Sequence, residues 1–264
     1  MRRRLDVELV RRGLVPSRTR AAEAISEGRV LVAGLPARTA ARHVAPDEPV
    51  TLTVEVGEQY VSRGGRKLAA AIDAFGVAVA GRTAVDVGAS TGGFSDCLLQ
   101  RGAAHVYAID VGRGQLAWTV RTDPRVTVME RTNVRDLGEG ALDPVPDLCV
   151  ADLSFISLRT VAPNLLAIVT EDADFVLLVK PQFEAGRARV PRGGVIRDPQ
   201  VHDAVLREVV GGLDGAGLGV RDFLPSPMRG ADGNIEFLAF ARRARASVGD
   251  AEVAEVVQRA QEDS

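Results

Sequence analysis

Lysine is almost absent from this sequence: Lys67 and Lys180 are the only lysines among 33 lysine and arginine residues. At every other basic position, where a positive charge alone is sufficient, the residue is arginine. Arginine cannot act as a base, because its pKa lies above about 12, whereas the pKa of a buried lysine shifts readily. The two lysines are therefore candidates for chemistry, with chance survival as the alternative. Lys180 is the stronger candidate, because it ends an apolar run and precedes Pro181.

Cysteine, histidine and long apolar runs are also scarce. Cys97 and Cys149 lie in apolar stretches and indicate buried free thiols, not a disulfide. With three histidines and no Cys/His cluster, no metal site is expected. No apolar run reaches the ~18 residues of a membrane span, and no secretion signal is recognisable. These absences argue for a cytoplasmic protein without membrane contact.

Charge is distributed unevenly along the 264 residues. Residues 1–45 hold ten arginines and four acids, a net charge of +6, so the rest of the chain carries −8. A basic end on an acidic body predicts that the N-terminus meets a polyanion. The length allows one good core plus a small module.

The N-terminal pattern predicts two basic helices, residues 2–13 and 18–27, with Ser17 capping the second, and strands at 30–32 and 50–54. This arrangement resembles the S4 RNA-binding domain, on the residues Arg4-Leu5-Asp6, Arg12-Gly13-Leu14, Ser17-Arg18 and Ala24-Ile25-x-x-Gly28-x-Val30-x-Val32. Arginines clustered on one face suit phosphates, and the alternative is a solvated basic helix pair without a ligand. The candidate RNA-binding residues are Arg3, Arg4, Arg11, Arg12, Arg18, Arg20, Arg63 and Arg66.

Apolar, strand-like runs alternate with helical patterns in the rest of the chain. The predicted strands cover residues 83–87, 105–109, 126–129, 148–151, 175–179, a run ending at 224, and 237–241. Such alternation predicts an α/β fold with a doubly wound, mostly parallel sheet, whose ligands lie beyond the carboxyl ends of the strands. The expected domain organisation is residues 1–56 for the RNA-binding domain, 57–66 for a flexible basic linker, 67–244 for the α/β domain, and 245–264 for a tail or short helix.

A glycine-rich turn between the first of these strands and the helix predicted at residues 94–100 is the best candidate ligand loop. It resembles the first loop of S-adenosylmethionine (SAM)-dependent methyltransferases, and an ordinary strand-to-helix turn is the alternative. The loop residues expected to bind the cofactor are Asp86, Gly88, Ser90, Thr91, Gly92, Gly93 and Phe94.

Two later residues also have cofactor-binding positions. Asp110 ends the next strand, a position where a carboxylate accepts hydrogen bonds from the ribose hydroxyls of a cofactor. The alternative is that Asp110 only caps the N-terminus of a helix. Asn133 would face the adenine edge, with Val134 over the ring, although asparagine after a strand is often a turn residue. Trp118, the only tryptophan, is expected in the core.

The whole pattern resembles the TlyA family of rRNA ribose 2′-O-methyltransferases, sometimes described as hemolysins, over residues 2–242. The motifs are Ser62-Arg63-Gly64-Gly65-Arg66-Lys67-Leu68, Asp86-Val87-Gly88-Ala89-Ser90-Thr91-Gly92-Gly93-Phe94, Asp152-Leu153-Ser154-Phe155-Ile156-Ser157-Leu158, Lys180-Pro181-Gln182-Phe183-Glu184 and Asn234-Ile235-Glu236-Phe237. The resemblance implies a Rossmann-like class I SAM-dependent methyltransferase, with a seven-stranded, mostly parallel sheet covered on both faces by helices. A small α+β S4 domain would precede this FtsJ/RrmJ-like domain.

The resemblance also implies a Lys-Asp-Lys-Glu catalytic tetrad on Lys67, Asp152, Lys180 and Glu236, and Asp152 would contact SAM as well. Lys180 would be the general base for a ribose 2′-hydroxyl. A nearby Lys67 would lower the pKa of Lys180, whereas the two acids would raise it while positioning the amines. A purely structural ion-pair network is the alternative. The implied substrate is cytidine in 16S and/or 23S rRNA, met as free rRNA or in ribosomal subunits, with no stable protein partner evident.

Three other functions compete with this one. A non-catalytic RNA-binding or ribosome-assembly factor would keep the fold, but the intact tetrad argues against it. A membrane-active hemolysin has no apolar or amphipathic segment of adequate length to support it. A small-molecule O-methyltransferase would leave the basic N-terminal module unexplained.

Overall fold

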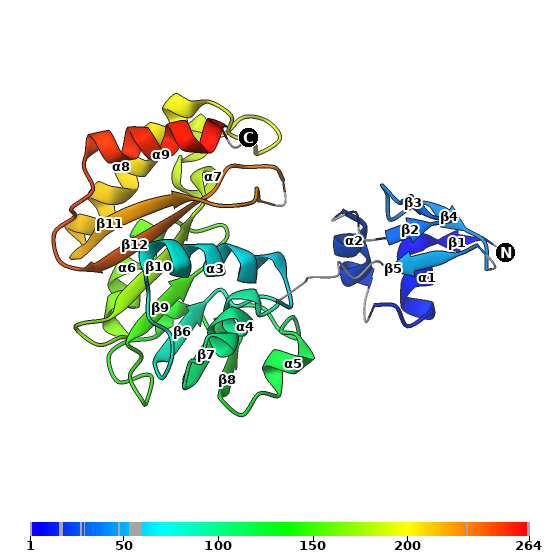
Figure 1. Cartoon of the computed structure of the whole chain (residues 1–264), viewed down its shortest axis with the longest axis horizontal. Coiled ribbons are helices and arrows are strands. Elements are labelled where there is room, and N and C mark those ends of the chain that lie inside the picture. Colours follow the sequence, from blue (N-terminus) through cyan, green and yellow to red (C-terminus); the bar gives the residue numbers. More distant parts are fainter. Residues whose placement is uncertain are drawn as a thin grey trace. The chain divides into compact units, whose positions relative to one another are not determined.

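The computed structural model describes residues 2–15, 18–26, 28, 30–46, 48–52, 60–230 and 232–262. The chain divides into two compact units, Met1–Glu58 and Gln59–Ser264 (Figure 1). Ser17, residues 53–54 and residues 57–59 of the predicted linker lie outside the described residues.

The N-terminal unit packs two helices against short strands. Its elements are β1 (Arg3–Arg4), α1 (Leu5–Arg11), α2 (Arg18–Ser26), β2 (Val30–Val32), β3 (Leu35–Pro36), β4 (His43–Val44) and β5 (Val50–Leu52). Leu5, Leu9, Ile25 and Val30 form its core. The predicted helix at residues 2–13 is too long at its start, because Arg3 and Arg4 pair with β4 as a strand instead.

The second unit alternates strands and helices. Its elements are α3 (Arg63–Phe75), β6 (Thr83–Val87), α4 (Gly93–Gln100), β7 (His105–Asp110), α5 (Trp118–Arg121), β8 (Val126–Glu130), η1 (Val134–Asp136), β9 (Leu148–Ala151), α6 (Leu158–Ala167), β10 (Asp174–Val179), α7 (Pro181–Glu184), η2 (Arg187–Arg189), α8 (Pro199–Gly215), β11 (Leu218–Pro225), β12 (Phe237–Arg243) and α9 (Asp250–Glu262).

Within residues 60–230 and 232–262, these strands form a seven-stranded sheet in the order β11-β12-β10-β9-β6-β7-β8. β12 runs antiparallel to both of its neighbours, and the remaining pairs are parallel. The predicted mostly parallel sheet is confirmed. Because the chain leaves β6 first toward β7 and later returns on its other side as β9, the sheet has its topological switch point between β6 and β9.

Alternate residues of each strand enter two separate cores, one on each face of the sheet. Val85 and Cys149 face the layer of α6, α8 and α9, whereas Ala84 and Val150 face α3, α4 and α5 (Figure 1). The two cysteines are buried and unbridged, as predicted. Burial raises the pKa of the Cys97 thiol to about 11.

Residues 63–66 form the first turn of α3, where the sequence favoured a flexible linker. The glycines there serve packing: Gly65 lies against the Tyr60 side chain, where a Cβ would clash, and Gly64 lies near the Phe94 ring. Leu68 and Ile72 bury one face of the helix, and Gly76 ends it in the left-handed conformation. The two glycines therefore mark close helix contacts, not flexibility.

The C-terminal helix and Trp118 give opposite outcomes for the sequence predictions. The expected C-terminal helix is present as α9, with Val253, Val256 and Val257 buried. The prediction that Trp118 belongs to the core is wrong, because 75% of this residue is exposed at the start of α5. Of the helices in the described residues, none is long and apolar enough to span a membrane.

Candidate active site

A cavity of about 420 Å³ opens where β6, β7 and β9 end, beside the switch point of the sheet. Six of the predicted cofactor residues line it: Gly88, Ser90, Asp110, Asn133, Val134 and Asp152. Neighbours to which sequence reasoning assigned no binding role also line it, among them Val111, Gln115, Thr132, Leu153, Ser154 and Phe155. Small-molecule sites measure about 300–1,000 Å³, so the cavity has the size for a nucleoside-containing ligand.

Gly88 and Asp110 fix the loops that follow β6 and β7 and form part of the cavity wall. Gly88 has a φ of +89°, and a Cβ there would clash with the Asp152 carbonyl, so this position requires glycine. The Asp110 carboxylate accepts the backbone N–H of Ser90 at 2.8 Å and that of Gly112 at 2.6 Å. Each carboxylate oxygen has a second lone pair, so Asp110 can still accept hydroxyl groups from a ligand.

Asn133 is a turn residue at the edge of the cavity. Its side chain accepts the Arg135 backbone N–H at 3.1 Å and caps the short helix η1, which is the turn role. It also lines the cavity beside the buried Val134. Its contact with adenine stays a prediction.

Five residues predicted to bind the cofactor do not line the cavity: Asp86, Thr91, Gly92, Gly93 and Phe94. Gly92 faces Leu116 and Val120, where a Cβ would come within 2.9 Å of Leu116. Gly93 packs against Ser62, and Phe94 is buried in the core. Gly92 and Gly93 are therefore required for close packing within the protein, and their contact with the cofactor stays a prediction.

Asp86 is fully buried inside β6 and does not reach the cavity surface. Its Oδ2 accepts the Ser95 hydroxyl at 2.7 Å, whereas Oδ1 has no hydrogen-bond partner among the described residues. The pKa of Asp86 is raised to about 7, mainly by burial; the Ser95 hydrogen bond opposes this rise and the nearby Asp152 adds to it. Its predicted direct contact with the cofactor therefore lacks geometric support.

The four predicted catalytic residues form two ion pairs. Lys180 Nζ lies 2.5 Å from Asp152 Oδ1 and also donates to Ser154 Oγ at 3.1 Å. Lys67, on α3, pairs with Glu236. In the sheet register, Val179 pairs with Phe237, so Lys180 and Glu236 flank the last residue pair between β10 and β12.

Phe155 is the most exposed apolar residue near this site, and sequence reasoning assigned it no role. It is 90% exposed, lines the cavity and has a φ of +65°. Its ring lies 5.0 Å from that of Phe183, which in turn lies 5.9 Å from Lys180 Nζ. Positive φ is costly for a bulky residue and gathers at functional sites, but no sequence pattern reveals it.

The N-terminal arginines are largely engaged with two buried acids. Arg4 and Arg18 bind Asp6 at 3.1 and 2.8 Å, and Arg11 and Arg12 bind Glu8 at 2.6 and 2.8 Å. The arginine hydrogen bonds lower the pKa of both carboxyl groups to about 2, against the opposing effect of burial.

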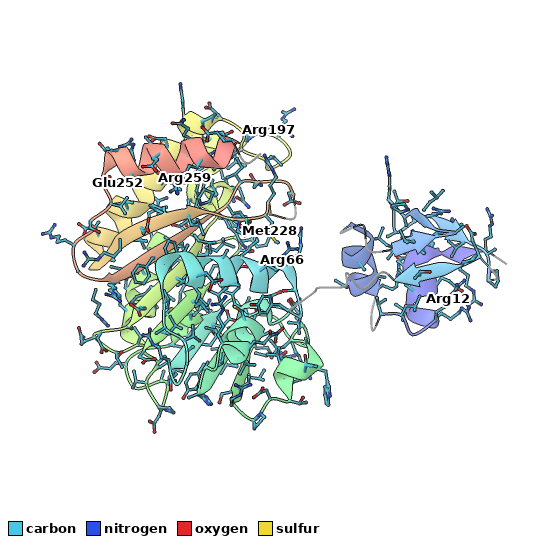
Figure 2. The ribbon with its side chains drawn as sticks, viewed as in Figure 1. Arg12, Arg66, Arg197, Met228, Glu252 and Arg259 are labelled. Atoms are coloured by element: carbon cyan, nitrogen blue, oxygen red, sulfur yellow. The ribbon has the colours of Figure 1, made fainter. Side chains whose placement is uncertain are left out.

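Arg12 is the most structural of these arginines. It also donates to the carbonyl groups of Ala45, Pro46 and Glu48, and its side chain is only 19% exposed. Figure 2 labels it within the N-terminal unit. Arg12 therefore ties α1 to the chain before β5, which differs from the free phosphate-binding role expected from the sequence.

The other predicted RNA-binding residues occupy different positions. Arg3 is exposed on β1, and Arg63 is exposed on the first turn of α3. Arg66, on the same turn, is exposed as well (Figure 2). The Arg20 side chain lies outside the described part of the chain. Within that part, no three His, Cys, Asp or Glu side chains gather as a metal site would require.

Family comparisons agree with this architecture. The FtsJ-like methyltransferase family matches residues 60–243, and the S4 domain family matches residues 3–50. The chain is therefore a methyltransferase of the FtsJ-like class that carries an S4 domain at its N-terminus.

Individual relatives identify the family within this class more specifically. The 16S/23S rRNA (cytidine-2'-O)-methyltransferase TlyA of Mycobacterium tuberculosis is 50% identical over 241 residues, which cover 91% of this chain and 90% of the relative. Hemolysin A of Brachyspira hyodysenteriae is 38% identical over 89% of this chain and 98% of its own length. The chain belongs to the TlyA family, as its motifs predicted.

Solved structures of similar proteins share this fold. A structure described as a "putative hemolysin" from Streptococcus thermophilus is 36% identical, with a TM-score of 0.80 over 99% of this chain and 96% of that one. Another, from Lactococcus lactis, is 40% identical with a TM-score of 0.73 and covers 78% of this chain.

Proposed function

We propose that this protein transfers the methyl group of SAM to a ribose 2′-hydroxyl of ribosomal RNA, with Lys180 as the general base. The observation that carries this proposal is the Lys180–Asp152 ion pair at the wall of the cavity, because Asp152 lines the cavity and also holds the amine. The name of the Mycobacterium tuberculosis relative, a 16S/23S rRNA (cytidine-2'-O)-methyltransferase, supports cytidine in 16S and 23S rRNA as the target.

The cavity residues fit SAM as the cofactor. Asp110 offers carboxylate oxygens for ribose hydroxyls, and Asn133 and Val134 provide a polar edge and an apolar face for adenine. SAM, when bound, supplies an activated methyl group on a sulfonium centre. Gly88 keeps the β6 loop against the Asp152 backbone, so the cavity is already formed.

Lys180 performs the proton chemistry in this proposal. Before it acts, the amine that is charged in its ion pair with Asp152 releases its proton to solvent. The neutral amine then takes the proton that the 2′-hydroxyl releases as it is methylated, so Nζ ends the step protonated. Asp152 and Ser154 hold Nζ from two sides. Orienting the hydroxyl supplies much of the remaining rate, because the methyl donor is already activated.

Lys67 and Glu236 have a supporting role. Lys67 is buried, and its charge is matched by the equally buried Glu236, so the pair can be held beside the site without an uncompensated charge. Phe155 presents an exposed ring at the cavity rim, where it can stack on a base of the substrate.

The S4 unit would bring the substrate RNA to this site. Exposed arginines such as Arg3 supply phosphate contacts, while Arg12 keeps the unit folded. A ribosomal substrate implies that the protein works in the cytoplasm.

The decisive experiment is transfer of labelled methyl groups from SAM to purified 30S subunits, 50S subunits and protein-free rRNA, followed by mapping of ribose methylation. We expect RNase-resistant label at ribose 2′-oxygens of cytidines. RNA binding without transfer would support the assembly-factor alternative, and leakage of liposome contents without transfer would support the hemolysin alternative. Either result would overturn the proposal.

A further inference from the structure

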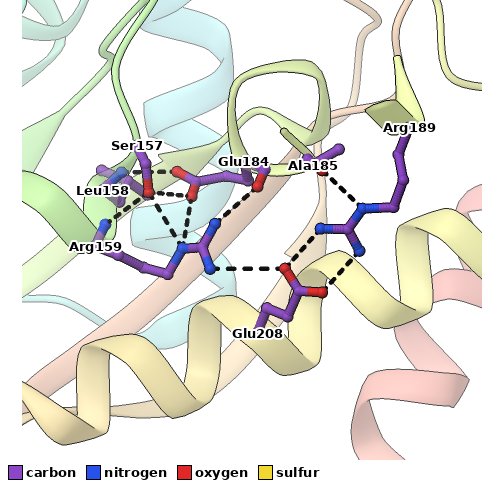
Figure 3. Close-up of polar contacts among 7 residues, drawn as sticks. All are labelled: Ser157, Leu158, Arg159, Glu184, Ala185, Arg189 and Glu208. Carbon is purple, nitrogen blue, oxygen red and sulfur yellow. Dashed lines mark hydrogen bonds and ion pairs between the residues drawn. The ribbon is translucent and has the colours of Figure 1, made fainter. Parts of the chain in front are cut away.

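Glu184 is buried at the end of α7, one helical turn after Lys180, and only 3% of it is exposed. Its carboxylate reaches across to the start of α6. Oε1 accepts the Leu158 backbone N–H at 2.7 Å, and Oε2 accepts the Ser157 hydroxyl at 2.5 Å (Figure 3). Ser157 Oγ in turn accepts the Arg159 backbone N–H at 3.1 Å. Glu184 therefore holds both the first N–H of α6 and the side chain that caps the helix.

A network of charged residues surrounds this carboxylate (Figure 3). Arg159 donates to the Glu184 backbone carbonyl at 2.8 Å and to Oε2 at 3.3 Å, and it lies 3.6 Å from Glu208. Glu208, on α8, accepts two hydrogen bonds of 2.7 Å from Arg189. Gly212 leaves room for the Arg159 stem, because a Cβ there would lie 2.5 Å from Arg159 Cδ. The buried charge of Glu184 is thus fully bonded, which offsets its desolvation.

This network joins the two chain segments that carry the proposed catalytic pair. Residues 152–157 hold Asp152 and run into α6, while α7 begins directly after Lys180. The α7 turn fixes the Lys180 carbonyl through the Phe183 backbone N–H at 2.9 Å. Its Phe183 ring contacts Phe155, and its Glu184 carboxylate binds Ser157. The single turn of α7 therefore contacts the loop of residues 152–157 at Phe155 and at Ser157.

We propose that Glu184 is a positioning residue for methyl transfer, which fixes the Asp152 segment against Lys180 by holding the beginning of α6. The inference rests on the proposed function of Lys180. A neutral Ser157 cap alone would start the helix, as it already accepts the Arg159 N–H. The carboxylate adds a link between the two catalytic segments, where a displacement of about 1 Å costs up to about 100-fold in rate.

The test compares single-turnover rates at saturating SAM and rRNA. Glu184→Gln keeps the size of the side chain and an acceptor for Leu158, but it loses the charge that binds Arg159 and an oxygen acceptor for Ser157. We expect its rate to fall about 10- to 100-fold, with RNA affinity unchanged. Ser157→Ala should slow the reaction similarly, and the double variant should be no slower than Glu184→Gln alone, because both changes break one link.

Glu208→Gln is the matched control, since Glu208 binds Arg159 and Arg189 and so lies one residue further from the cavity than the Glu184 carboxylate. It should lower the melting temperature slightly and keep the wild-type rate. A Glu184→Gln rate within twofold of wild type, or an equal loss in Glu208→Gln, would overturn the inference. If Glu184→Gln does not fold, a wild-type rate in Ser157→Ala overturns it instead. No transfer by the wild-type protein would mean that the proposed function itself has failed.

Discussion

Lys180 Nζ lies 2.5 Å from Asp152 Oδ1, and the two residues directly follow β10 and β9, which are adjacent parallel strands. Parallel strands bring their carboxyl ends to one edge of a sheet, so residues 28 positions apart in sequence become an ion pair. This pairing makes the two lysines unequal, because Lys180 adjoins the cavity through Asp152 whereas Lys67 is buried against Glu236.

The first prediction uses this inequality. Lys180→Arg keeps the charge but removes the group that can take up a proton, so methyl transfer should fall about 10²–10⁴-fold. Lys67→Arg should lose less, because an arginine can still pair with Glu236. Single-turnover transfer of labelled methyl from SAM measures both, with SAM and RNA binding as controls. The opposite ranking would exchange the two roles, and wild-type turnover in both variants would exclude either lysine as the base.

The second prediction concerns Gly92, which packs on Leu116 and Val120. Gly92→Ala would add a Cβ 2.9 Å from Leu116 at a φ of +92°, and such strain costs about 1–3 kcal/mol. We expect the chain that includes the cavity residue Gln115 to shift and SAM affinity, measured by calorimetry, to fall at least about tenfold. Gly138→Ala is the control, since nothing lies within 4 Å of a Cβ there. Equal SAM affinity in both variants would contradict the role of this packing.

The third prediction separates RNA contact from folding in the N-terminal unit. Arg3→Ala should reduce the slope of log K against log salt for rRNA binding by roughly one, with no loss of stability. Arg12→Ala removes the Glu8 ion pair and three hydrogen bonds to carbonyl groups, so it should destabilise the unit by about 1–3 kcal/mol. Hydrogen exchange over residues 5–11 measures the second effect. Faster exchange in Arg3→Ala than in Arg12→Ala would reverse these assignments.

Sequence reasoning was most successful where burial leaves a local signal. The runs ending at Val87, Ala151 and Val179 are mostly apolar and buried on both faces, so the central strands and their order of appearance were predictable. Lys180 was found from composition and motif together. The pairing of Lys180 with Asp152 depends on sheet register, which a single sequence does not contain.

The errors share a cause in tertiary contacts. Gly64 and Gly65 are typical of linkers, but they pack α3 against Phe94 and Tyr60. Trp118 is a large apolar residue of the kind usually found in a core, but it begins a short helix and is mostly exposed. Glu184 belongs to one of the family motifs, but sequence reasoning assigned it no role, because its partner Ser157 lies 27 residues earlier in the chain. Local propensity cannot report any of these neighbours.

The last prediction follows from the fully buried Asp86. Its pKa is raised to about 7 in the folded protein, mainly by burial, whereas an unfolded aspartate titrates near 3.9. The folded state therefore binds the proton more tightly, and the contribution of Asp86 to stability is complete below about pH 4 and is lost as the pH rises through about 7.

Asp86→Asn replaces the group by a neutral side chain of the same shape, so it removes this pH dependence. We expect the variant to match the wild type near pH 4 and to exceed its free energy of unfolding at pH 8.5 by up to about 4 kcal/mol, the equivalent of three pKa units. Thermal and urea unfolding at several pH values measure the difference. Ser95→Ala is the companion variant: it removes the hydrogen bond that opposes the shift, so it should raise the Asp86 pKa further and weaken the protein most at high pH. A difference between Asp86→Asn and wild type that stays constant from pH 5 to 8.5 would show that Asp86 does not titrate in this range.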